Sequence, residues 1–237
     1  MTVSRETSAE IRKGLGDIWL VGLGLIPLGL AFGLLMTQSG FAWWWTPIFS
    51  TVIYAGSMEF VALNMVLGGV GPLSAALTGF MVNFRHIFYG LTYPLQLVRS
   101  TVGRIYGAYA LTDECYAVVS ALPRSTRLTG VRLLTIQVVI QLFWVLPGII
   151  GALVGGIIPP DIDGLDFALT ALFIVLAYEA FQSTRDLGAV LVAAAIGIVA
   201  AIAFPAQMLI IALTTYFLLL LARFWSPRLD STLTWRV

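Results

Sequence analysis

The sequence is poor in the residues from which disulfides, metal sites and nucleic-acid interfaces are built. Its 237 residues contain one cysteine and one histidine, and only 11% of them are charged. The lone Cys115 excludes an intrachain disulfide, and one cysteine with one histidine leaves too few ligands for a zinc site. The net charge of +1 is not gathered into a basic patch of the kind that binds nucleic acid. We therefore expect no metal, no cofactor and no nucleic-acid partner.

The sequence is rich in long apolar runs. Hydrophobic residues make up 59% of the sequence, and the mean hydropathy is +0.94. Soluble domains of this size do not have such a composition. Apolar runs of about 20 residues are long enough to cross the bilayer core as helices. The sequence therefore predicts an all-α integral membrane protein that forms one transmembrane domain over residues 1–237.

About eight hydrophobic segments follow one another along the chain. They lie at residues 15–36, 47–67, 73–95, 104–122, 133–158, 165–181, 187–204 and 205–225. Either all eight segments span the membrane, or six span it and the second and fourth are broken or re-entrant. The second is interrupted at residues 55–57 (AGS), and the fourth is weakly hydrophobic. Both arrangements put the tails, residues 1–14 and 226–237, in the cytoplasm, because Lys and Arg gather there.

A short internal similarity accompanies these two unusual segments. Residues 59–62 (EFVA) resemble residues 114–117 (ECYA), and each stretch is followed by another apolar segment. Interrupted segments in corresponding halves of a chain are typical of transporters with an inverted repeat. We therefore treat an inverted repeat as a hypothesis.

An arginine and the only histidine lie side by side in the third segment, within MVNFRHIFYG at residues 81–90. Burying Arg85 near the bilayer centre costs roughly 2.5 to 3.5 kcal/mol, so it needs a partner or a task. At about 100° per residue, Asn83, Arg85, His86 and Tyr89 share one helical face. A fixed cation, a group that titrates near neutral pH, an amide and a phenol together could bind a carboxylate and handle protons.

Small residues and a proline mark the first segment. Pro27 lies at its middle, and Gly29 and Gly33 are spaced as a small-xxx-small pair. This pattern predicts a kinked helix that packs closely on a neighbour. The alternative is that backbone groups freed by Pro27 line a substrate cavity, which would make these three residues a hinge or gate.

Several short motifs, in one order over most of the chain, resemble those of AzlC-type large subunits of branched-chain amino acid exporters. They are AFGL at 31–34, IYAGS at 53–57, NFRH at 83–86, LTDE at 111–114 and GLDFAL at 164–169. The stretches around Trp43, Glu59 and Arg85 are most similar to the BrnF-like branch. The resemblance implies a multi-pass protein of the bacterial cytoplasmic membrane. It would export valine, leucine, isoleucine and methionine together with a small AzlD-type membrane subunit.

A zwitterionic, aliphatic substrate would need a cation, an acid or carbonyl group, and an apolar pocket. Arg85 and unwound backbone near the break of the second segment would face its carboxylate, and Glu59 or Asp113 its ammonium group. The full set of expected substrate-binding residues is Arg85, Glu59, Asn83, Gly56, Ser57, Tyr54 and Asp113. The alternative is that Arg85 pairs with Glu59, Asp113 or Glu114 as a structural ion pair.

Proton coupling is expected from ionisable groups at membrane depth, which commonly mark proton relays. The candidates are His86, Asp113, Glu114 and Glu179. His86 as a hydrogen-bonded packing residue and Glu179 as a solvated helix-end residue are the alternatives.

An enzyme is not expected. Ser57 lacks the flanking glycines of a nucleophile elbow, and His86 is the only histidine available as a base. A channel, or a transporter for another small zwitterion or anion, is the alternative function, and saturable flux coupled to a gradient would distinguish the exporter from it.

Overall fold

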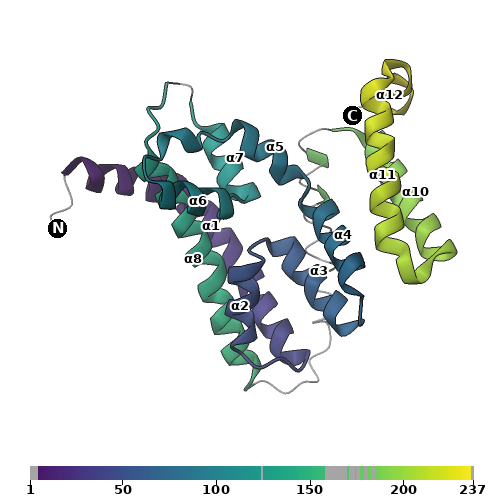
Figure 1. Cartoon of the computed structure of the whole chain (residues 1–237), viewed down its shortest axis with the longest axis horizontal. Coiled ribbons are helices and arrows are strands. Elements are labelled where there is room, and N and C mark those ends of the chain that lie inside the picture. The colour runs from purple at the N-terminus through teal and green to yellow at the C-terminus, as the bar shows by residue number, and fades with distance from the viewer. Residues whose placement is uncertain are drawn as a thin grey trace. The chain divides into compact units, whose positions relative to one another are not determined.

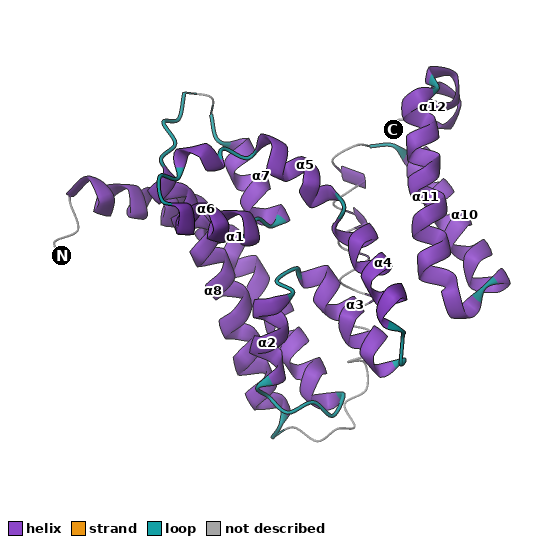
Figure 2. Ribbon diagram, viewed as in Figure 1, coloured by secondary structure: helices purple, strands orange, loops and turns teal. Residues whose placement is uncertain are grey.

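All regular elements in the described part of the chain are helices (Figures 1 and 2). The computed structural model describes residues 5–123, 125–157, 170, 174, 177–178, 181–182 and 185–235. The helices are α1 (Arg5–Gln38), α2 (Trp45–Val52), α3 (Gly56–Leu67), α4 (Pro72–Asn83), α5 (Arg85–Thr92), η1 (Leu95–Leu97), α6 (Thr101–Tyr109), α7 (Asp113–Ala121), α8 (Gly130–Gly155), α10 (Leu187–Ala203), η2 (Pro205–Gln207), α11 (Met208–Trp225) and α12 (Pro227–Leu233). The predicted all-α class is confirmed.

Among the described helices, α1, α8 and α11 are long and apolar enough to cross a membrane. The helices α3 and α10 are also apolar but shorter. At 1.5 Å per residue, the 34 residues of α1 exceed the roughly 30 Å of a hydrocarbon core. Its polar N-terminal turns therefore extend beyond the apolar part of the helix.

The chain divides into two compact units. The first comprises residues 1–63 and 84–168, and the second residues 64–83 and 169–237. This division does not test the expectation that residues 1–237 form one transporter domain, which stays a prediction.

The first unit is organised around α1 packed against α8, the most extensive helix pair among the described residues. Glycines on both helices permit this contact. A Cβ at Gly33 would overlap the Gly148 carbonyl oxygen and would lie 2.6 Å from the Ala152 amide nitrogen. A Cβ at Gly151 would likewise overlap the Leu30 carbonyl oxygen. These neighbours are backbone atoms, which cannot turn aside as a side chain would, so the close packing expected for the first segment is confirmed.

Pro27 lies inside α1 without dividing it, and both Gly29 and Gly33 are buried against α8. A hinge or gate at these three residues stays a prediction.

An ion pair joins the first turns of α8 to the N-terminal part of α1. The Arg132 guanidinium donates to both Asp17 carboxylate oxygens, at 2.6 and 2.8 Å. The Thr129 hydroxyl, which also caps α8, donates to Glu10 at 2.6 Å. The two helices are thus joined by polar contacts at one end and by glycine packing along their length.

The second and fourth segments, for which full spans and broken or re-entrant helices were both considered, are each divided, and the third is divided too, into α4 and α5. The second is divided into α2 and α3, separated by residues 53–55, where Tyr54 has a φ of +43°. The fourth is divided into α6 and α7, separated by residues 110–112, and the Thr112 hydroxyl caps the start of α7. A non-glycine residue with positive φ is a strained backbone position of the kind that clusters at functional sites.

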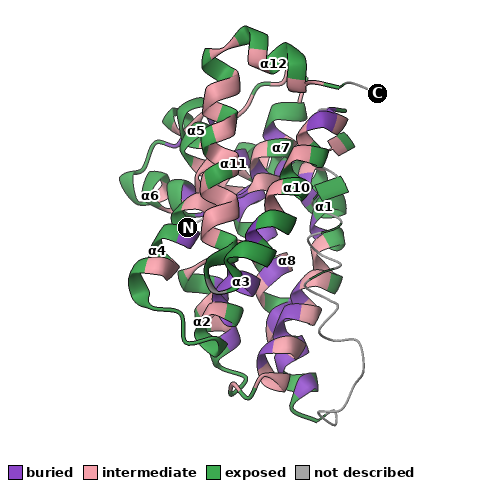
Figure 3. Cartoon of the chain, turned by 90° about the vertical axis from the view of Figure 1, so that its right-hand side faces the viewer, coloured by how far each residue is buried: buried purple, intermediate pink, exposed green. Residues whose placement is uncertain are grey.

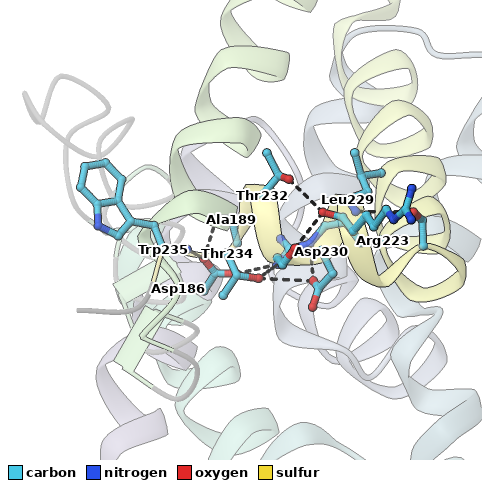
Figure 4. A network of polar contacts seen from close by, with 11 residues as sticks. Asp186, Ala189, Arg223, Leu229, Asp230, Thr232, Thr234 and Trp235 are labelled. Atoms are coloured by element: carbon cyan, nitrogen blue, oxygen red, sulfur yellow. Dashed lines mark hydrogen bonds and ion pairs between the residues drawn. The ribbon is translucent and has the colours of Figure 1, made fainter.

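In the second unit, α11 packs against α10, α12 and α4. None of the described residues of α11 is buried, as Figure 3 shows. Polar contacts tie the C-terminal segment to the start of α10 (Figure 4). Arg223 donates to Asp186, Asp230 and Thr234 at 2.9, 2.9 and 2.8 Å. Asp186 in turn accepts from the Trp235 amide at 3.1 Å.

Candidate functional site

Arg85 is paired with an acid of the fourth hydrophobic segment. The Arg85 Nε lies 2.8 Å from Asp113 Oδ1, and its Nη2 lies 2.5 Å from Oδ2. The arrangement is the bidentate fork that makes Arg–carboxylate pairs geometrically specific. Arg85 opens α5, and Asp113 opens α7. Of the three acids considered as ion-pair partners for Arg85, Asp113 is therefore the one that holds it.

This pair is not sealed from its surroundings. The Arg85 and Asp113 side chains are 40% and 38% exposed, respectively. Two opposite charges thus stand together at a half-exposed position inside segments that are otherwise apolar. Such a pair matches the two charges of an amino acid, which could replace or bridge the contact.

Aromatic rings flank the ion pair. The Tyr89 phenol interacts with both Asp113 and Arg85. Its ring stacks on Tyr116 with centroids 4.2 Å apart, and the His86 ring meets it edge-on at 5.3 Å. Arg85, His86 and Tyr89 therefore occupy one neighbourhood, as their spacing predicted.

A second polar focus surrounds Glu59 and is fully buried. Ser50 Oγ donates to Glu59 Oε2 at 2.7 Å, and Trp144 Nε1 donates to Oε1 at 2.9 Å. The backbone amide of Ala55 also interacts with this carboxylate. Glu59 and Ser50 are both 0% exposed, and no ion pair to Glu59 occurs among the described residues. Glu59 therefore does not pair with Arg85 in this structure.

Aromatic packing closes the space around Glu59. Phe32 of α1 meets Phe60 edge-on at 5.1 Å and stacks near Trp144 at 6.2 Å. A Cβ at Gly56 would lie 3.0 Å from the Trp144 ring, so glycine allows the indole to pass the start of α3. The carboxylate thus lies where α1, α2, α3 and α8 converge.

A tyrosine and glutamine cluster lies beside the break between α2 and α3. Tyr106 donates to Gln141 Oε1 at 2.7 Å, and Gln141 donates to the Tyr109 hydroxyl at 3.0 Å. Tyr109 donates to the Thr51 carbonyl, and its ring lies 5.6 Å from that of Tyr54. The buried Tyr54 hydroxyl has no hydrogen-bond partner among the described residues. This cluster presents hydroxyl and amide groups at the strained turn.

The remaining expected residues are distributed as follows. Gly56 and Ser57 lie in the first turn of α3 and are half-buried. Asn83 ends α4 in the second unit, so the helical face that was expected to include it is interrupted before Arg85. Glu114 is half-buried in the first turn of α7, next to Asp113. Glu179 lies outside the described residues.

Sequence reasoning did not select the partners of Glu59. Ser50 lies in α2 and Trp144 in α8, whereas the acid lies in α3, and these two side chains donate hydrogen bonds to its carboxylate oxygens. A signal was present in α8, because Gln137, Gln141 and Trp144 recur at i, i+4 and i+7 in an apolar segment. That spacing predicts one polar face, and all three side chains donate hydrogen bonds in the first unit.

Comparison with known proteins places this chain among membrane proteins of one family. The family model described as AzlC protein matches residues 21–158. The branched-chain amino acid transport protein AzlC of Bacillus subtilis is 32% identical over 191 residues, which cover 79% of this chain and 74% of that protein. The inner membrane protein YgaZ of Escherichia coli is 31% identical over 188 residues, covering 76% and 77%. An uncharacterized membrane protein of Helicobacter pylori is 30% identical over 166 residues, covering 69% and 72%. No solved structure matches the chain.

Proposed function

The chain belongs to the AzlC family of membrane proteins, and we propose that it is the large subunit of a secondary transporter for branched-chain amino acids. It exports valine, leucine, isoleucine and methionine across the bacterial cytoplasmic membrane, and the export is coupled to protons. The Bacillus subtilis relative is named as a branched-chain amino acid transport protein, and this supports the substrate class. The inner-membrane Escherichia coli relative supports the location.

The observation that carries this function is the half-exposed Arg85–Asp113 pair at the start of two helices. In the proposed substrate complex the amino acid carboxylate engages Arg85, and its ammonium group engages Asp113. An aliphatic side chain would then lie against the apolar and aromatic residues around Tyr54 and Phe60. Arg85 suits this role because its planar guanidinium recognises carboxylates in a bidentate manner.

The proposed topology has eight hydrophobic segments with both termini in the cytoplasm. The third segment is divided into α4 and α5, and segments two and four are divided as well. In each, a short helix (α2 or α6) is followed by a break and a second helix (α3 or α7) whose first turn carries an acid. This correspondence supports a repeat of the kind found in transporters with discontinuous helices. The second proposed component is a small AzlD-type subunit, and full export from cells that lack any such subunit would contradict it.

The test is efflux of labelled leucine from proteoliposomes that contain this chain and the small subunit, with and without an imposed proton gradient. Saturable flux driven by the gradient is expected from the wild type, and it should be lost in Arg85→Ala. Arg85→Lys separates the two roles of the arginine: it keeps the charge but not the bidentate fork, so near-normal export would exclude bidentate carboxylate binding.

The alternative of a channel, or of a transporter for another small zwitterion or anion, is tested in the same vesicles. Flux that rises linearly with leucine concentration and ignores the gradient would indicate a channel. Competition by unlabelled glycine or acetate, with none by valine, would indicate another substrate.

A further inference from the structure

We propose that Glu59 is the residue that takes up and releases the coupled proton, and that Ser50 is the hydroxyl that adjusts to both of its protonation states. This inference rests on the proposed proton-coupled transport and adds a residue that the expected relay did not include. Its basis is the geometry around the carboxylate.

The first argument is the contrast between Asp113 and Glu59, two acids of the first unit. Asp113 is held by a guanidinium at 2.5 Å and is 38% exposed. Glu59 is 0% exposed, and its polar contacts with the described residues are a hydroxyl, an indole N–H and a backbone amide, all of them neutral. A permanently paired acid such as Asp113 is poorly suited to exchange a proton, since its charge is neutralised by the cation. An acid held only by neutral groups can exist with or without its proton.

The second argument is the balance of forces on Glu59. A fully buried carboxylate that is not paired with a cation is electrostatically unfavourable, and taking up a proton makes it neutral. The neutral hydrogen-bond donors, together with the position of Glu59 in the first turn of α3, favour the ionised form. These opposing effects leave both forms accessible, which a proton carrier requires.

The third argument is which oxygen receives the proton. The indole N–H of Trp144 is a donor only, so Oε1 must remain an acceptor in both forms. Ser50 faces Oε2 and, as a hydroxyl, it can donate to the carboxylate or accept from the acid. On protonation, Oε2 becomes the donor, and the Ser50 hydrogen turns away from it. One O–H bond forms at Oε2 and breaks again on release, with no other bond changed.

Groups on each neighbouring helix are compatible with this role. Tyr109 of α6 is a titratable group that interacts electrostatically with Glu59. The packing from α1 is the ring of Phe32, and that from α8 is the indole of Trp144. The Tyr109 hydroxyl is hydrogen-bonded to the Thr51 carbonyl at the end of α2, beside the break that precedes α3. This break is the proposed point at which the proton reaches Glu59.

The coupling follows from the direction of transport. A proton from the outer side binds Glu59 Oε2, and it leaves to the cytoplasm in the same cycle that moves the amino acid outward. Without a removable proton at this residue, substrate can still exchange across the membrane, but the proton gradient can no longer drive its accumulation.

The experiment compares the wild-type complex with Glu59→Gln in proteoliposomes. Glutamine imitates the protonated acid, because its amide oxygen can accept from Trp144 and its amide nitrogen can donate to Ser50. The readout is gradient-driven accumulation of leucine divided by the exchange of labelled for unlabelled leucine at equal pH in the same vesicles, and we expect this ratio to fall in Glu59→Gln. Accumulation driven by a pH gradient should fall to the level seen without a gradient. Accumulation equal to the wild type, or loss of exchange together with accumulation in folded protein, would overturn the proposal.

Ser50→Ala is the matched variant. It removes the adjusting hydroxyl but leaves the acid, so gradient-driven accumulation should persist. Its half-maximal rate should move to higher pH, because the hydrogen bond lost is stronger to the carboxylate than to the acid. An unmoved pH profile would exclude the proposed role of Ser50.

An infrared difference spectrum gives a readout that does not depend on transport. Wild type minus Glu59→Gln should show the C=O stretching band of a protonated carboxylic acid, and the band should disappear as the pH is raised. Its absence at every pH would overturn the proposal for Glu59. If the wild type exchanges no leucine at all, the proposed function fails instead, and the infrared band still decides whether Glu59 holds a proton.

Discussion

The contact between α1 and α8 should depend on the absence of a single side-chain carbon at Gly33. In Gly33→Ala the new Cβ would overlap the Gly148 carbonyl oxygen and lie 2.6 Å from the Ala152 amide nitrogen. Ordinary contacts of a Cβ begin at about 3.4 Å, so the two helices must separate. Overpacking a close contact typically costs about 1 to 3 kcal/mol. Because the obstructing atoms are backbone, we expect the upper end of that range.

Gly24 on the same helix is the matched control. A Cβ there meets nothing within 4 Å, so Gly24→Ala adds the same carbon without a clash. Alanine is the better helix former by up to about 1 kcal/mol, so the control should be neutral or slightly stabilised. For a chain of this length, 1 kcal/mol shifts Tm by roughly 2 to 4 °C. Gly33→Ala should therefore melt roughly 6 to 12 °C below the wild type.

The single cysteine supplies the assay. Cys115 is 0% exposed in the first unit, so a thiol-reactive fluorophore labels it as that unit unfolds. Heating wild type, Gly33→Ala and Gly24→Ala with the dye in detergent measures the three values of Tm. If the two variants melt together, the close approach of α1 and α8 is not what requires glycine at position 33.

Two further predictions concern ion pairs at the ends of the apolar segments. Arg132→Met should lower stability by about 1 to 3 kcal/mol, because it leaves the largely buried Asp17 carboxylate without its partner. Adding Asp17→Asn should restore part of the loss, and thermal melts of the single and double variants measure both effects. At the second pair, the hydrogen bond from Arg223 holds the pKa of Asp186 below its ordinary value. The stabilisation is therefore present above the unfolded value near 3.9 and lost as pH falls through the folded pKa. The Tm difference between wild type and Asp186→Asn should shrink over that acidic range, and a constant difference would refute the linkage.

The break in the second segment is a feature that the local sequence pattern predicts correctly. Ala55-Gly56-Ser57 predicted an interruption, and α3 begins at Gly56 after a turn at Tyr54. Turn and capping preferences act over a few residues, so they can be read from sequence. The same reasoning does not extend to the end of α4, where Asn83 and Arg85 fall in different helices. The sequence has no glycine or proline at residues 83–85 from which the interruption between α4 and α5 could be predicted.

Composition, periodicity and small-residue spacing by themselves determined that this protein is an all-α membrane protein, that α1 packs closely through its glycines, and that Arg85 and Tyr89 share a face. These properties depend on neighbours along one helix. Only the tertiary structure decided that Arg85 pairs with Asp113, 28 residues away, and that Glu59 meets Trp144, 85 residues away. Each acid had several chemically suitable partners. Helix packing selects among them, because it alone determines which groups come within hydrogen-bonding distance.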